Sequence, residues 1–395
     1  MLLFIMHLLH DALGIKTPAV FEYCSTRMAL AAITALLVIL FFGKYFIRIL
    51  YAWKVGDKVR TEYCPLLGEL HRNKNDTPTM GGILILFALL VSLLLWMDLR
   101  SPFTLILFLT TVVIGTLGGL DDYKKLRYKN KKGVSGRKKL LIQGGFAFLI
   151  ALYLLSGNLS EWIHFGNWFV PPDIKAEGVN LTLREYAARL YVPFFKEPVL
   201  QWSGLGLIGM ALLIIVVITG SSNAVNLTDG LDGLATGTVM LASSAFALIA
   251  FISNNLDISR YLNILYIEGS SEIAIYLAAL AGACLGFLWY NGHPAQVFMG
   301  DTGSLTLGAI LGVSAVLLKR ELLLSIIGGV FVIEALSVMI QVGVYKYCGK
   351  KRFFLCTPIH HHFEYKGWPE TKVVVRFWIV GLLLAIIGIA TLKFQ

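Results

Sequence analysis

Long apolar runs alternate with short polar breaks along almost the whole chain. A helix needs about 20 mostly apolar residues to cross the hydrocarbon core of a bilayer, and the runs are close to that length. Ten runs can be marked, at residues 28–43, 80–96, 103–120, 140–156, 204–220, 234–253, 272–290, 304–318, 322–345 and 375–392. The pattern predicts an all-α polytopic membrane protein with about ten transmembrane helices, which form a single integral membrane domain over residues 1–395.

Two segments add detail to this picture. The opening stretch MLLFIMHLLHDALGI contains His7, His10 and Asp11, and it lacks the basic start and small-residue cleavage site of a signal peptide. We expect it to form an interfacial helix or an extra, partial span. In the ninth run, Gly328-Gly329 is a possible break, and a broken span would open a groove toward lipid.

Composition and charge agree with a membrane protein and predict its orientation. Hydrophobic residues make up 57% of the chain and charged residues 15%, which excludes a soluble globular protein. The formal net charge is +10, and most basic residues lie in the connections 44–79, 121–139 and 346–372. Because basic loops stay in the cytoplasm, these connections are predicted to be cytoplasmic. A basic rim also attracts anionic lipids and phosphates, and we expect no nucleic-acid partner.

The same count orients the rest of the chain. The connections 221–233 and 291–303 are odd-numbered along the chain, as the three basic connections are, so they also face the cytoplasm. Both termini and the long connection 157–203 then lie outside. The pattern predicts a cleft on the cytoplasmic face of the membrane.

The cysteines do not indicate a framework. There are five, an odd number, so disulfides are not expected. Cys348 and Cys356 lie near a histidine triplet, but their spacing matches no common zinc pattern.

Acidic residues stand in three of the cytoplasmic breaks. Asp121 and Asp122 follow two glycines at the end of the third run. Adjacent residues of a helix are about 100° apart, so one carboxylate can point into a site while the other binds backbone or a lysine. A solvated helix end balanced by Lys124 and Lys125 explains this pair equally well.

The second break, NAVNLTDGLDGLA, contains Asn226, Asp229 and Asp232 at a spacing of three. They share one face if the segment is helical, and an Asx-rich turn or a helix N-cap is the alternative. The third break places Asp301 between Gly300 and Gly303, where it is either an N-cap or a carboxylate that holds magnesium against diphosphate oxygens. Asn291, ten residues earlier, is a further candidate for the same cavity.

Two more polar features need a function. Three consecutive histidines, His360, His361 and His362, lie in a cytoplasmic loop, where they can donate to phosphate or carbonyl oxygens. Glu334 lies near the centre of the ninth run. An ionisable residue at that depth is functional or paired inside the bundle.

Together, these motifs resemble those of the polyprenyl-phosphate N-acetylhexosamine-1-phosphate transferases. The similar segments are TPTMGG at 77–82, DDY at 121–123, NLTDGLD at 226–232, FMGD at 298–301 and PIHHHFE at 358–364. They occur in the family's order between about residues 72 and 365. The histidine triplet is similar to that of the branch whose donor is UDP-N-acetylmuramoyl-pentapeptide.

The resemblance implies an activity. The phospho-sugar would pass from the UDP-linked donor to undecaprenyl phosphate, with Mg²⁺ as cofactor, giving UMP and the first lipid-linked peptidoglycan precursor. The location that the resemblance implies is the bacterial cytoplasmic (inner) membrane, and homodimers occur in the family.

The resemblance also implies residue roles. Asp301 matches the magnesium ligand, Asp121 the base or nucleophile, and Asp122 its support. His360 and His361 match positions required for activity. The positions that match substrate-binding or cleft residues are Lys74, Thr79, Lys125, Lys139, Asn226, Asp229, Asp232, Asn291, Phe298, Gln341, His361 and His362. The basic insert after Lys125 leaves Lys138 as an alternative to Lys139.

Two rival functions remain to be tested. An ion-coupled transporter could use Glu334 and the aspartates as cation ligands, although transporter sites usually lie near the midplane. A sister transferase using UDP-N-acetylglucosamine is the other alternative.

Overall fold

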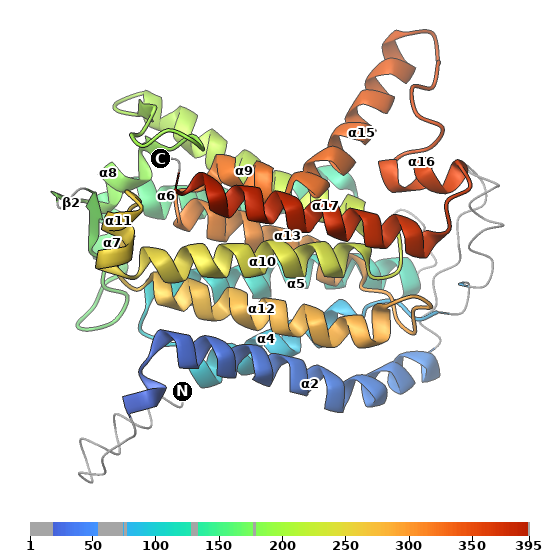
Figure 1. Ribbon diagram of the computed structural model, residues 1–395, viewed down its shortest axis with the longest axis horizontal. Coiled ribbons are helices and arrows are strands. Elements are labelled where there is room, and N and C mark those ends of the chain that lie inside the picture. Colours follow the sequence, from blue (N-terminus) through green and yellow to red (C-terminus); the bar gives the residue numbers. More distant parts are fainter. Residues whose placement is uncertain (1–18, 54–73, 75–76, 128–132, 177–178, 394–395) are drawn as a thin grey trace.

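The computed structural model describes residues 19–53, 74, 77–127, 133–176 and 179–393, which form a nearly all-helical bundle (Figure 1). The expected interfacial helix at the start of the chain lies outside these residues, as do parts of the loops 44–79 and 121–139. The helices are η1 (Ala19–Phe21), α2 (Cys24–Ala52), α4 (Gly82–Trp96), α5 (Pro102–Arg127), α6 (Gly136–Leu155), α7 (Gly157–Ile163), α8 (Leu183–Ala187), α9 (Gly206–Thr228), α10 (Leu234–Ser253), α11 (Leu256–Tyr261), α12 (Ser270–Asn291), α13 (Gly300–Leu317), α14 (Glu321–Ile327), α15 (Gly329–Tyr347), α16 (Ile359–Tyr365) and α17 (Glu370–Thr391).

All ten apolar runs are helical, as predicted. In the described part of the chain, nine helices are long and apolar enough to cross a membrane, and α4 is a shorter apolar helix of 15 residues. The ninth run is broken, because α14 ends at Ile327 and α15 begins at Gly329. The expected break at the glycine pair is therefore confirmed.

The helices form a core and a rim. Of an 18-residue apolar stretch of α13, 89% is buried inside the bundle, compared with 28% of such a stretch in α2. The central helix α13 packs against α9, α5 and α4, whereas α2 packs mainly on α12. On α2 the buried residues recur every four positions, at Ala31, Ala35 and Ile39, so one stripe faces the bundle. Its other face is left for lipid.

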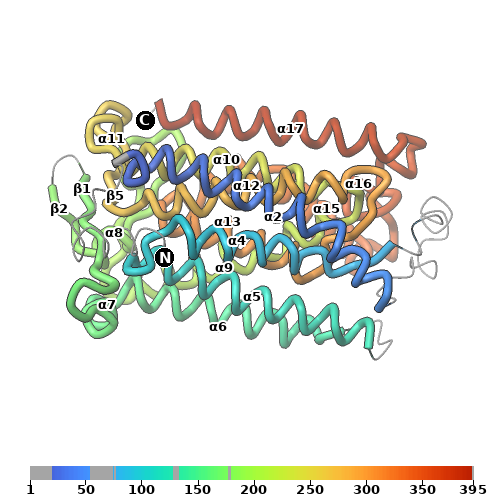
Figure 2. The backbone as a smooth tube through the Cα atoms, turned by 90° about the horizontal axis from the view of Figure 1, so that it is seen from below, coloured from blue at the N-terminus to red at the C-terminus, as the bar shows by residue number. Residues whose placement is uncertain are grey.

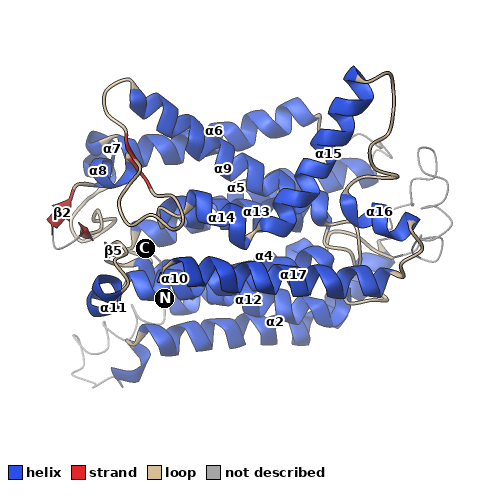
Figure 3. Cartoon of the chain, turned by 45° about the horizontal axis from the view of Figure 1, so that its top comes forward, coloured by secondary structure: helices blue, strands red, loops and turns tan. Residues whose placement is uncertain are grey.

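The two ends of the bundle differ (Figures 1 and 3). The long connection 157–203 folds at one end into α7, α8 and the short strands β1 (Ile174–Ala176), β2 (Val179–Leu181), β3 (Arg189–Leu190) and β4 (Leu200–Gln201). Strands β2, β1 and β5 (Tyr266–Ile267) form an antiparallel sheet in that order, in which Ile174 pairs with Leu181 and Ile267. Strands β3 and β4 form a separate antiparallel pair. Helix α16 lies at the opposite end.

The first long helix begins, and the last one ends, at the end of the bundle that carries the strands (Figures 1 and 2). Because the helices cross the bundle an even number of times, the chain must begin and end on the same side. That this end faces outward stays a prediction from the basic loops.

Helix α15 diverges from the other helices after the break in the ninth run (Figure 3). Its sides expose large apolar residues, among them Met339, Val342 and Tyr347. Apolar surface of this kind on a membrane protein is suited to contact with lipid chains.

Candidate active site

Close contacts between helices bring two acidic motifs together. A Cβ on Gly118 of α5 would lie 2.4 Å from the carbonyl oxygen of Asp301, and one on Gly82 would lie 2.2 Å from the backbone nitrogen of Gly303. Only glycine permits backbones to approach this closely. The glycines before Asp121 and Asp122 therefore place the end of α5 against the start of α13.

Asp122 caps α13 from the neighbouring helix. Its carboxylate accepts hydrogen bonds from the backbone N–H of Asp301 (3.2 Å) and Thr302 (2.9 Å) and from the Thr302 hydroxyl (2.6 Å). The first N–H groups of a helix lack partners within the helix and carry a partial positive charge. Asp122 is thus the member of the pair that binds backbone.

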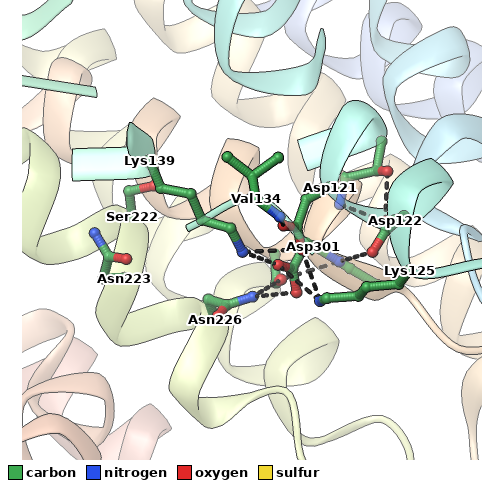
Figure 4. A network of polar contacts seen from close by, with 12 residues as sticks. Asp121, Asp122, Lys125, Val134, Lys139, Ser222, Asn223, Asn226 and Asp301 are labelled. Carbon is green, nitrogen blue, oxygen red and sulfur yellow. Dashed lines mark hydrogen bonds and ion pairs between the residues drawn. The ribbon is translucent and has the colours of Figure 1, made fainter. Parts of the chain in front are cut away.

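Asp121 and Asp301 share two lysines (Figure 4). Lys125 Nζ lies 2.7 Å from Asp121 Oδ2 and 3.1 Å from Asp301 Oδ2, and Lys139 Nζ lies 2.9 and 2.6 Å from the same two atoms. The other Asp121 oxygen accepts the backbone N–H of Val134 at 2.6 Å. Two lysines, one from α5 and one from α6, therefore neutralise the buried carboxylate of Asp121 and the half-buried carboxylate of Asp301.

Helix α9 adds an amide to this cluster. Asn226 Nδ2 donates to Asp301 Oδ1 (3.0 Å) and to the Ser304 hydroxyl (2.8 Å). Figure 4 shows the side chains of Asn226, Lys125 and Lys139 converging on Asp301. The convergence of three acidic breaks at one end of the bundle, which the sequence predicted, is confirmed.

The acids of the second break do not share a helical face with Asn226. Helix α9 ends at Thr228, and the next helix begins only at Leu234. Asp229 accepts the backbone N–H of Gly300, which brings it close to the first cluster. Of the alternatives that the sequence left open, the structure therefore selects the turn.

A second polar cluster surrounds Asp232. Lys74 Nζ lies 2.7 Å from Asp232 Oδ1 and 2.6 Å from Glu370 Oε1. His293 Nδ1 lies 3.1 Å from Asp232 Oδ2 and 3.5 Å from Glu370 Oε2. Sequence reasoning missed His293 and Glu370, because nothing in the sequence distinguishes Glu370 from any acidic residue in the first turn of a helix.

Two groups of described side chains are arranged so that they can hold a metal ion. Ligand atoms of Asp121, Asp122 and Asp301 lie within 4.8 Å of one another, as do those of Asp232, His293 and Glu370. Only the second group includes a histidine, and the Lys74 ammonium lies against both of its carboxylates. An all-oxygen set is what magnesium prefers.

The first group suits a hard cation for a further reason. Its three carboxylates face two ammonium groups, so one negative charge is left over when all are ionised. Asp121 Oδ2 already lies against both ammonium groups, so the excess charge belongs to the group as a whole. An excess buried charge is costly, and a cation offsets that cost.

The histidine triplet is ordered by separate contacts. His361 Nδ1 lies 2.7 Å from Glu364 Oε2, and His362 Nδ1 accepts the backbone N–H of Leu355 at 3.2 Å. The candidate metal groups among the described residues contain no cysteine.

The remaining predicted site residues mostly hold backbone in place. Phe298 exchanges backbone hydrogen bonds with Pro78 and Gly81, which ties the TPTMGG segment to the start of α13. Gln341 Oε1 accepts the backbone N–H groups of Phe353 and Phe354.

Asn291 and Thr79 lie nearer the acids. The Asn291 side chain is 3% exposed, accepts from the Gly233 N–H and the Thr236 hydroxyl, and donates to the Val297 carbonyl. These hydrogen bonds hold the turn that carries Asp232 in place. Thr79 lies beside Gly300, where a Cβ would be 2.9 Å from the threonine hydroxyl.

Comparison with known proteins agrees with this geometry. The model of glycosyl transferase family 4 matches residues 104–319, and signature 1 of phospho-N-acetylmuramoyl-pentapeptide-transferase matches residues 74–86. The matched segments contain the aspartates of both clusters and Lys74.

Curated relatives match over nearly their whole lengths. Phospho-N-acetylmuramoyl-pentapeptide-transferase of Protochlamydia amoebophila is 62% identical, over 100% of both chains. The enzymes of the same name from Neisseria meningitidis serogroup C and Desulfotalea psychrophila are 46% and 44% identical, over 95% of this chain and 96% and 95% of theirs. The chain therefore belongs to the phospho-N-acetylmuramoyl-pentapeptide-transferases within glycosyl transferase family 4.

Proposed function

We propose that the protein transfers phospho-N-acetylmuramoyl-pentapeptide from its UDP-linked donor to undecaprenyl phosphate, releasing UMP and forming lipid I. The observation that carries this proposal is the convergence of Asp121, Asp122 and Asp301 with Lys125 and Lys139 at one end of a membrane bundle. The acceptor is carried in the bilayer and the donor arrives from water, so the reaction belongs at an interface. We place that interface at the cytoplasmic face, as the basic loops indicate.

The cofactor that best suits the carboxylates is Mg²⁺. Asp301 would hold it, with Asp121 and Asp122 within reach, and when bound it would neutralise charge on the donor diphosphate and on the departing UMP. The chain's own cations supply the rest. Lys125 and Lys139 now bind carboxylates, and a cation at Asp301 would free their ammonium groups for the diphosphate oxygens.

The acceptor phosphate attacks the phosphorus that carries the sugar, and the bond from that phosphorus to UMP breaks. The acceptor is already ionised near neutral pH, with a second pKa of about 6, so a strong base is not needed. Asp121 is fully buried, with one oxygen held by a backbone N–H and the other between two ammonium groups. A nucleophile needs in-line access to phosphorus, so we propose direct transfer in which Asp121 orients the lysines and takes up the last proton.

Donor choice provides the first test. Purified protein with undecaprenyl phosphate should release one UMP per lipid product from UDP-N-acetylmuramoyl-pentapeptide. It should use UDP-N-acetylglucosamine at least about 100-fold less efficiently, a ratio that a site contacting the missing groups can reach. Radiolabelled donors and thin-layer chromatography of the lipid product measure both. Equal use of the two donors would favour the sister transferase, and coupled ion flux in liposomes without transfer would favour a transporter.

The affinity of the site for Mg²⁺ is expected to rise with pH between about 6 and 8. Burial, and then the negative charges of Asp301, Asp122 and Asp232, raise the pKa of Asp229 to about 7. Asp229 is therefore protonated below that pH, where its proton competes with a nearby cation, and ionised above it. Calorimetric titration with Mg²⁺ should detect proton release near pH 7 and much less near pH 9.

A matched pair of variants checks the origin of that proton. Asp229→Asn should abolish the release, whereas Asp257→Asn, an exposed aspartate in α11 at the other end of the bundle, should retain it. An Mg²⁺ affinity that stays constant between pH 6 and 8 would contradict the assignment.

A further inference from the structure

Glu334 is a buried carboxylate that the proposed mechanism does not use. It lies in α15, just after the break in the ninth run, and is 0% exposed. Its Oε1 lies 3.1 Å from His360 Nδ1, and among the described residues neither oxygen has a hydrogen bond of good geometry. Burying a carboxylate costs much free energy unless a partner compensates its charge. That partner is the imidazole of His360.

The opposite edge of the His360 ring packs against the turn between α9 and α10, which carries Asp229 and Asp232. A Cβ on Gly230 would lie 2.3 Å from His360 Nε2 and 2.8 Å from Cε1. The ring itself is 0% exposed, and it too has no hydrogen bond of good geometry in the described part of the chain. Gly230 directly follows Asp229 and lies two residues before Asp232. The ring therefore fills the space between Glu334 and the turn that carries both aspartates.

This contact completes the support of the turn. Glu370 accepts the backbone N–H of Asp232 at 2.8 Å, and Asn291 accepts that of Gly233 at 3.2 Å. Those bonds hold the second half of the turn. The first half carries Asp229, and it is held by the hydrogen bond from Gly300 and by packing of Gly230 against His360. The orientation of one imidazole therefore affects the geometry of the site.

We propose that Glu334 is a positioning residue for the transfer reaction: it holds His360, and through that ring it fixes Gly230 and Asp229 relative to Asp301. Glu334 itself touches no substrate. A displacement of about 1 Å in a catalytic arrangement costs about 100-fold in rate, so a residue that acts through another can have a large effect. The inference rests on the transferase activity proposed above.

The test compares two substitutions at this position. Glu334→Gln keeps an oxygen acceptor at the same place, and Glu334→Met keeps the approximate shape without one. We expect Met to lower kcat about 30-fold with the KM for undecaprenyl phosphate changed less than threefold, and Gln to retain at least about a third of wild-type kcat. Unchanged kcat in Glu334→Met would overturn the proposal.

A matched control separates positioning from general stability. Glu272 is also a buried glutamate in a membrane helix, paired with Arg27 at 2.8 Å, but at the opposite end of the bundle. Glu272→Met should lower the melting temperature while leaving the kcat of the folded protein within about threefold of wild type. Equal losses of kcat in Glu272→Met and Glu334→Met would mean that Glu334 is merely structural.

A double-mutant cycle tests the route through His360. Gly230→Ala should impair the wild type strongly, because the new Cβ meets the ring. In the Glu334→Met background the ring is free to turn away, so the same change should cost at least fivefold less. Additive effects would refute the coupling. Wild-type protein runs in the same assay, and its failure to transfer would instead refute the proposed function.

Discussion

Replacing Asp301 by Asn is expected to abolish metal-dependent transfer while the protein stays folded. Asp301 is where Lys125, Lys139 and Asn226 converge, and it belongs to the all-carboxylate group. The neutral amide removes the charge that attracts a divalent cation and leaves two ammonium groups against Asp121 alone. We expect kcat to fall at least about 10³-fold, which corresponds to about 4 kcal/mol of transition-state stabilisation. UMP release measured over a range of Mg²⁺ concentrations would show it.

The control for this variant is Asp257→Asn, which removes an exposed aspartate far from the site. It should leave both kcat and the Mg²⁺ requirement unchanged. Near-normal activity of Asp301→Asn at ordinary Mg²⁺ would remove Asp301 from the metal role, and unfolding would show as a lost melting transition.

The second large effect is expected for Lys139→Met. Its ammonium lies 2.6 Å from Asp301 Oδ2 and 2.9 Å from Asp121 Oδ2, whereas the neighbouring Lys138 is exposed. Without Lys139, one of the two cations available to the donor diphosphate is missing. Removing one preorganised charge or donor of this kind typically costs about 10²-fold in kcat. Lys138→Met, one residue away on the same helix, should stay within about threefold of wild type.

This pair also decides between the two lysines that the sequence left open. If Lys138→Met is the damaging change and Lys139→Met is mild, Lys138 and not Lys139 contacts the diphosphate, and the assignment is wrong. Kinetics with varied donor should place the Lys139 effect in kcat and in the KM for donor, with the KM for undecaprenyl phosphate little changed.

Much of the fold could be predicted from the apolar runs alone. Each run became a helix because backbone groups in lipid must bond internally, and the glycine pair at 328–329 ended α14 as expected. The position of α13 in the centre of the bundle could not be predicted. Among the candidate spans of the described residues α13 has the lowest hydropathy, so apolarity alone does not mark it as the most buried helix. Its burial depends on which neighbours surround it.

The candidate site was predictable in outline but not in its contacts. Parity placed Asp121, Asp229 and Asp301 at one end, and the structure brings them together. The spacing of Asn226 and Asp229 allowed a shared helical face, which the end of α9 at Thr228 excludes. Glu370 escaped notice because its partner Lys74 is almost 300 residues away in the chain.

The sequence alone determined which segments form long apolar helices, where the ninth run breaks, and that the acidic breaks share one end of the bundle. Those properties depend on the period and length of apolar runs, which are local. Only the tertiary structure decided that Lys139 rather than Lys138 reaches Asp301, that Asp122 caps α13, and that Glu334 meets His360. These contacts depend on the rotation and close approach of whole helices, which many distant side chains set together.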